Sequence, residues 1–240
     1  SAPVIEKYQP LLVQVGDQTV LRGTMCMIAM GITSATSAMR VFQTERREYF
    51  RENSRLPKFR HTLVYFFGKD AAFLHQWAIG PLVFVLVFHS ITVPRCSMWE
   101  MYLPLAGAYY CGAGLSYLVC LIAPPNVAQE LAVVLVFGFA MFAGGIMRLP
   151  QLMDKIPPLC YLHHISFLRY VLEAFYVAEA NEWADEISLM GTNFTDFLAE
   201  AYNYSPDTYG INVGVTFVWG LVFRLTALGV MAFGDRAKKL

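Results

Sequence analysis

The stretch TERREYFRENS, Thr44 to Ser54, is a run of charged residues between two long apolar segments. On a helix, Glu48 and Arg51 lie one turn apart, as do Glu52 and Arg55, and opposite charges at this spacing stabilise a helix without burial. The pattern therefore predicts a short amphipathic helix. A solvated connector that holds two membrane-spanning helices apart would have the same pattern, so the residues alone leave both interpretations open.

The composition indicates an integral membrane protein. Of the 240 residues, 56% are hydrophobic and 15% are charged, whereas soluble proteins carry about a quarter charged residues. The mean hydropathy is +0.44. The net charge is zero, so no basic surface is expected to attract nucleic acid. We therefore expect a multi-pass membrane protein that contacts membrane lipid and no nucleic acid; the sequence does not indicate which membrane.

A helix needs about 20 apolar residues to cross a bilayer. Five segments are long and apolar enough, or nearly so: 21–42, 71–91, 101–123, 131–147 and 211–233. Pro124 and Pro125 end the third of them. The predicted fold class is all-α: a polytopic membrane protein with about five transmembrane helices, a cytoplasmic helix after the first, and an external loop region.

Two further regions are less apolar than these spans. Residues 1–20, which include Pro3 and Pro10, are predicted to form a loop before the membrane. Residues 148–208 carry prolines and a series of acidic side chains, and they are predicted to form the external folded loop region. The membrane domain itself is expected to occupy residues 21–240.

Basic residues predict the orientation, because cytoplasmic loops are enriched in Lys and Arg. Eight of them lie within residues 40–69, and three more follow the last span. Both regions are therefore predicted to be cytoplasmic, and alternation through five spans places residues 148–208 on the other side. Asn193 begins an Asn-Phe-Thr acceptor for N-glycosylation, which is used only on that side, so Asn193 is a predicted glycosylation site.

Polar residues inside the predicted spans are candidates for function. The first span is rich in small and hydroxylated residues, including Thr33 and Ser37, which let helices pack closely or line a substrate path. Arg224 falls near the middle of the last span, where a charged group is costly and usually faces protein or water. We expect Arg224 to have a partner, to reach the cytoplasmic interface or to bind a backbone carbonyl.

Motifs for other chemistry are not found in the sequence. There is no GxxxxGK[ST] phosphate-binding loop and no GxSxG nucleophile motif, so neither ATP binding nor intramembrane hydrolysis is predicted for this chain. The five histidines and five cysteines show no spacing typical of a metal site. A bridge between Cys96 and Cys160 would form only if both faced an oxidising compartment.

Three segments resemble the permease of the G-type ABC transporters. The first is the charged stretch with Glu45, Phe50 and Glu52, which is similar to the coupling helix between the second and third membrane helices of that family. The second is MFAGGIM, Met141 to Met147. The third is IPPLCYLHHISFLRYVLEAFYVAE, Ile156 to Glu179, which resembles the external re-entrant segment.

The resemblance covers roughly residues 16–240 and implies that the five spans correspond to the second to sixth helices of a six-helix permease. It implies a coupling helix at about residues 43–56 and an apolar valve at the extracellular end of the path. The resulting site predictions are Glu45, Arg46, Glu48, Tyr49, Phe50, Arg51 and Glu52 for coupling to an ATPase, Thr33, Ser37, Phe137 and Met141 for the substrate path, and Ile146 and Met147 for the valve. No aromatic residue occurs between Ile28 and Ala38, where drug-exporting relatives carry a substrate-stacking Phe, so a flat aromatic substrate is not expected.

These features predict the transmembrane permease part of an ATP-driven ABC exporter, which moves a lipid-like or amphipathic substrate by alternating access in a homodimer or heterodimer. The implied partners are a nucleotide-binding ATPase domain, which would hold ATP and magnesium, and a second permease; no cofactor is expected in this chain. Two other hypotheses remain open. One is a degenerate permease fragment that serves as a structural subunit of a larger membrane complex, and the other is a haem- or pigment-binding subunit, which rests only on the histidines.

Overall fold

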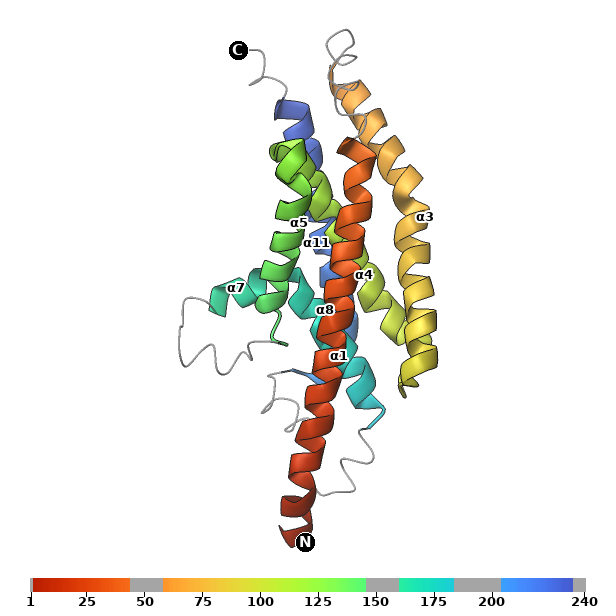
Figure 1. Cartoon of the computed structure of the whole chain (residues 1–240), viewed down its shortest axis with the longest axis vertical. Coiled ribbons are helices and arrows are strands. Elements are labelled where there is room, and N and C mark those ends of the chain that lie inside the picture. Colours follow the sequence, from red (N-terminus) through yellow and green to blue (C-terminus); the bar gives the residue numbers. More distant parts are fainter. Residues whose placement is uncertain (1, 44–57, 146–159, 184–203, 235–240) are drawn as a thin grey trace.

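The computed structural model describes residues 2–43, 58–145, 160–183 and 204–234. These residues form seven α-helices and one 3-10 turn, and no strand occurs among them, so the prediction of an all-α fold is confirmed. In chain order the elements, drawn in Figure 1, are α1 (Ala2–Gln43), α3 (Lys58–Thr92), α4 (Met98–Ile122), α5 (Pro125–Met141), α7 (Cys160–Ile165), α8 (Phe167–Asn181), the 3-10 turn η2 (Pro206–Thr208) and α11 (Tyr209–Gly234).

Several of these helices have the length and composition of membrane spans. Among the described residues, three segments are long and apolar enough to cross a bilayer: Thr62–Thr92 in α3, Met98–Ile122, which is α4, and Tyr209–Ala232 in α11. Asn126–Met141 in α5 is a shorter apolar helix. Helix α1 is longer than any of these, but its hydroxylated and small residues make it less apolar. The chain is a multi-pass integral membrane protein.

The start of the chain differs from the prediction. Residues 1–20 were expected to form a loop, but α1 is helical without a break from Ala2. Pro3 lies in the first turn, where its missing N–H leaves no hydrogen bond unmade. Once the span is helical, each added residue extends an existing helix and needs no new nucleus, so a polar segment can continue it.

Local sequence signals account for the two ends of α4. At its start, the Ser97 hydroxyl accepts a hydrogen bond from the backbone N–H of Glu100 (3.3 Å), and the Glu100 carboxylate accepts one from the N–H of Ser97 (2.9 Å). This reciprocal pair satisfies two donors that the first turn of a helix leaves unpaired. At its end, Ile122 is the last helical residue before Pro124, as predicted. Pro125 then opens α5, six residues earlier than the predicted fourth span.

Helix α4 lies at the centre of the bundle. In Figure 1 it runs behind α1, with α3 to one side and α5 to the other, and it also packs against α8 and α11. Most of its side chains are buried, including Leu105, Cys111 and Tyr117. Helix α4 therefore contacts α1, α3, α5, α8 and α11.

Small residues allow backbones to approach α4 closely. A Cβ atom placed on Gly112 would overlap the Ser34 hydroxyl of α1 and lie 3.0 Å from the Gly31 carbonyl oxygen. On another side of α4, a Cβ atom on Gly114 would lie 3.0 Å from the Gly220 carbonyl oxygen of α11. Close packing of this kind is how helices associate when lipid removes the hydrophobic driving force between them.

Candidate functional site

An ion pair within the bundle joins three helices. The Arg224 side chain on α11 is 4% exposed, and its Nε donates to Oδ1 of Asp70 on α3 at 3.0 Å. Its Nη1 donates to the Tyr110 carbonyl of α4 at 2.7 Å, and the guanidinium carbon lies 3.5 Å from the centroid of the Tyr110 ring. The expectation of a partner or a backbone carbonyl for Arg224 is confirmed, because the structure provides both.

The acidic partner was not predicted. Asp70 lies one residue before the predicted span 71–91 and therefore outside the predicted membrane spans. In the structure α3 is continuous from Lys58, and the Asp70 side chain is 22% exposed. A buried Arg in one span needs a counter-charge, so an acidic residue at the edge of another span is a candidate partner. This reasoning would have predicted Asp70.

The four predicted path residues lie on α1 and α5, which pack closely together. A Cβ atom on Gly31 would lie 2.8 Å from Cγ1 of Val136. The helices run in opposite directions past this crossing, since Gly145, just after α5, meets Thr24 of α1. Ser37 lies six residues beyond Gly31, about 9 Å along the axis. The Ser37 end of α1 therefore diverges from the Gly145 end of α5.

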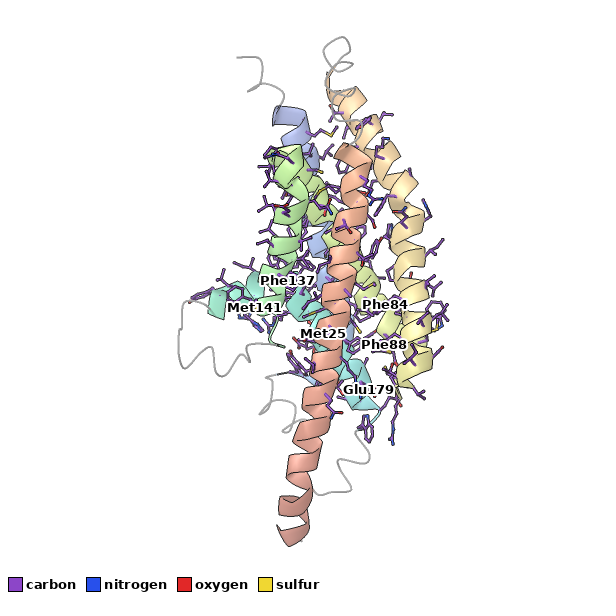
Figure 2. All side chains as sticks on the ribbon, viewed as in Figure 1. Met25, Phe84, Phe88, Phe137, Met141 and Glu179 are labelled. Carbon is purple, nitrogen blue, oxygen red and sulfur yellow. The ribbon has the colours of Figure 1, made fainter. Side chains whose placement is uncertain are left out.

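Phe137 and Met141 lie on the part of α5 beyond the crossing with α1. Phe137 is 47% exposed and Met141 is partly buried, and Figure 2 shows both on α5. Thr33 is exposed on α1, while Ser37 lines a pocket with Gln76 of α3. The structure thus places Ser37 in a pocket beside α3 and Phe137 on an exposed part of α5, and the path role of all four residues stays a prediction.

Two side chains from the region after α5 satisfy carbonyl groups at the end of α5. Ser166 Oγ donates to the Phe139 carbonyl at 2.7 Å, and His163 Nδ1 donates to the Phe142 carbonyl at 2.7 Å. The last carbonyls of a helix have no partner within it, so these bonds fix the position of the α5 end. Gly144 follows in a left-handed conformation, with φ of +100°, which favours glycine. The predicted valve residues come directly after this turn.

His163 is fixed in its neutral form. The side chain is 1% exposed, and burial, with a smaller contribution from the nearby Arg169, lowers its pKa to about 4. Because the Phe142 carbonyl can only accept, the proton of the neutral ring lies on Nδ1. The hydrogen bond to α5 is therefore kept at neutral pH without a buried charge.

A second set of contacts ties α8 to the turn between α3 and α4. The Glu179 carboxylate, labelled in Figure 2, accepts hydrogen bonds from the N–H of Cys96 (3.2 Å) and of Arg95 (3.4 Å). The Arg95 guanidinium lies 3.7 Å from the centroid of the Trp183 ring. Cys96 is a free thiol, and burial together with Glu179 raises its pKa. Glu179 is the last residue of the third segment that resembles the family, and the structure shows that it positions this turn.

The remaining predicted sites fall outside the described residues. They are the coupling residues Glu45, Arg46, Glu48, Tyr49, Phe50, Arg51 and Glu52, the valve residues Ile146 and Met147, and the glycosylation site Asn193. Their roles stay predictions.

Comparison with known proteins identifies the family. Residues 10–237 match the family model of the ABC-2 type transporter. The chain is 28% identical over 174 residues to ABC transporter G family member 28 of Arabidopsis thaliana, a match that covers 72% of this chain and 15% of that protein. It is 24% identical over 202 residues to ABC transporter G family member 25 of Oryza sativa subsp. japonica, which covers 84% of this chain and 18% of that protein.

The chain thus spans less than a fifth of the length of these relatives. The family match covers nearly the whole bundle, including the Arg224–Asp70 pair and the capped end of α5. The chain belongs to the ABC-2 type transporter family and is a permease domain of the G type.

Proposed function

We propose that this chain is the transmembrane part of an ATP-driven exporter, which works by alternating access with a second permease. ATP and magnesium would bind to a nucleotide-binding partner domain. The substrate is lipid-like or amphipathic. Membership of the ABC-2 type transporter family, over residues 10–237, is the observation that carries this proposal.

The exposed faces of α1 and α5 support a path between two permeases. On α5 the apolar side chains Val134 and Phe137 are 63% and 47% exposed, and on α1 the Met25 side chain is 59% exposed. Thr33 and Ser37 add hydroxyl groups to α1 further along. A face with many apolar side chains and a few hydroxyls suits a substrate that is mostly apolar with one polar part.

Coupling to the ATPase provides the first test. Glu52→Arg in the complete transporter is expected to abolish substrate-stimulated ATP hydrolysis, because Glu52 lies in the connector between α1 and α3 that would contact the ATPase. Insertion and folding should stay normal, because the charged stretch is predicted to lie outside the membrane and surface substitutions usually change stability by no more than about 0.5 kcal/mol. Basal and stimulated hydrolysis would be measured side by side.

Glu130→Arg is the matched control, because Glu130 is exposed on α5 and predicted to lie on the same side of the membrane. It should leave the stimulation unchanged. Stimulation retained in Glu52→Arg would reject the coupling role. If no ATPase domain is joined to the chain or purifies with it, that result would favour the hypothesis of a structural subunit.

The valve provides the second test. We propose that Ile146 and Met147 close the external end of the path, directly after the Gly144 turn that His163 and Ser166 support. Replacing both with alanine is expected to increase passive leak of substrate from vesicles, because two bulky apolar side chains are lost at the constriction. Ile165→Ala is the control, because Ile165 is an exposed residue of α7. Equal leak in the double variant and in this control would contradict the assignment.

A further inference from the structure

Arg169 of α8 connects this helix with α7. Its Nη1 lies 2.5 Å from Nδ1 of His164 on α7, and its Nε lies 3.9 Å from Oε2 of Glu173, one turn further along α8. The Tyr170 hydroxyl donates to the His164 carbonyl at 3.2 Å. Because a guanidinium only donates hydrogen bonds, Nδ1 of His164 accepts and the proton of this ring lies on Nε2. The bond to Arg169 therefore exists only while His164 is neutral.

The neighbouring His163 connects α7 with the end of α5. Its Nδ1 donates to the Phe142 carbonyl at 2.7 Å, and its ring packs against the following turn, since a Cβ atom on Gly144 would lie 3.2 Å from its Cε1. Its Nε2 is buried and has no hydrogen-bond partner among the described residues. A second proton on this ring would create a buried cation with an unsatisfied donor near Arg169, and both features are costly.

The charged and titratable groups around the two histidines come from α8 and from the segment before η2. In the part of the chain that the structure describes, they are Arg169, Glu173 and Tyr204. Glu173 has two partners, because Thr208 donates to its Oε1 at 3.0 Å while Arg169 faces its Oε2. Burial raises the pKa of Tyr204, so its hydroxyl stays neutral. A proton that binds to either histidine is therefore repelled by Arg169.

Acid affects the two histidines in different ways. His164 is exposed and binds protons from solvent, and its protonated ring has no nitrogen left to accept from Arg169. Repulsion between two cations then replaces the hydrogen bond. His163 is buried, and its pKa of about 4 is lowered first by burial and then by Arg169. The contact between α7 and α8 is thus lost at a higher pH than the one at which His163 itself is protonated.

We propose that His163, His164 and Arg169 form a proton-sensitive joint, which holds the end of α5 at neutral pH and releases it in acid. Figure 1 shows α7 beside that end of α5. Val134 and Phe137, which face the proposed path, lie on the same helix. Release of the end of α5 therefore loosens the wall of the path. This consequence for transport rests on the proposed function, whereas the joint itself does not.

The first measurement is the melting temperature of the purified complete transporter at about pH 7.5 and about pH 5. Stability falls as the pH falls from about 6.5 to about 4, because the unfolded chain binds protons that the folded histidines do not bind. The drop in melting temperature should be about 4 °C larger in the unaltered protein than in the double variant His163→Asn with His164→Asn. Asparagine does not titrate, but its amide still donates to the Phe142 carbonyl or accepts from Arg169.

His164→Asn alone should remove part of this difference, and it is expected to fold because His164 is exposed. His75→Asn is the matched control, because His75 is an exposed histidine on α3. It should show the full drop of the unaltered protein. An equal drop in His164→Asn and in the unaltered protein would overturn the proposal, and so would a smaller drop in His75→Asn.

The second measurement is the passive movement of a fluorescent phosphatidylcholine between the leaflets of vesicles that contain the transporter, without ATP. The charge of this lipid does not change between the two pH values. Its movement should be faster at pH 5 in the unaltered protein but not in His164→Asn. Unchanged movement, together with the expected melting difference, would overturn only the effect on the path. If ATP fails to drive movement of this lipid at pH 7.5, the proposed lipid export fails, while the melting comparison still decides whether the joint exists.

Discussion

Replacing Arg224 with methionine is expected to lower the free energy of unfolding by about 3 kcal/mol. The change leaves the Asp70 carboxylate inside the bundle without its partner and removes the donor to the Tyr110 carbonyl. The value lies at the lower end for buried pairs because the Asp70 side chain is 22% exposed. Denaturant unfolding of the complete transporter, followed by the fluorescence of the membrane domain, would measure it.

The double variant Arg224→Met with Asp70→Leu is expected to recover most of the lost stability. Removing both charges also removes the desolvation cost, and apolar replacements of buried pairs are often neutral or stabilising. Arg22→Met, at an exposed position of α1, should change the stability by no more than about 0.5 kcal/mol. If Arg224→Met is as stable as this control, the ion pair does not hold the three helices together.

Gly112→Ala is the second substitution with a large expected effect. Its Cβ atom would overlap the Ser34 hydroxyl, which is fully buried and donates to the Gly31 carbonyl at 2.9 Å. The Gly31 carbonyl oxygen, only 3.0 Å away, is backbone and cannot rotate aside. The helices α1 and α4 must therefore separate, and we expect a loss of about 2–3 kcal/mol, as for other overpacked cores.

Gly138→Ala on α5 is the matched control, and it should raise the stability of the protein instead of lowering it. No described atom outside its own helix lies within 4 Å of a Cβ atom placed on Gly138. Alanine there should stabilise the helix by about 0.5–1 kcal/mol, because alanine loses less backbone entropy on folding. Thermal unfolding of the two variants would be compared. A stabilised Gly112→Ala would show that the crossing of α1 and α4 is looser than the structure describes.

The membrane helices were predictable because hydropathy indicates the length of each span and proline indicates where a helix ends. The third span was predicted at 101–123, and α4 occupies Met98–Ile122. The last was predicted at 211–233, and α11 occupies Tyr209–Gly234. Residues 1–20 were predicted wrongly, because a polar segment that extends an existing helix has no hydropathy signal of its own.

The arrangement of polar residues was predictable only in part. The need of Arg224 for a partner follows from its depth in the membrane, but the choice of Asp70 depends on which helices are neighbours. Likewise, the predicted path includes both Ser37 and Phe137, and only the structure shows that Ser37 lies in a pocket beside α3. Hydropathy gives the depth of a residue but not the direction in which its side chain points around the helix axis.

The pair between Asp70 and Arg224 also has a consequence for biosynthesis. The two residues are separated by 154 positions in the chain. At about 5–20 residues per second, a ribosome needs about 8–30 seconds to add that many residues. Both α3 and α4 are completed within this interval, well before the guanidinium that joins them is added. Final packing of the central helix must therefore wait until the last helix has been synthesised, and a nascent chain that stops before α11 carries an acidic side chain without its counter-charge.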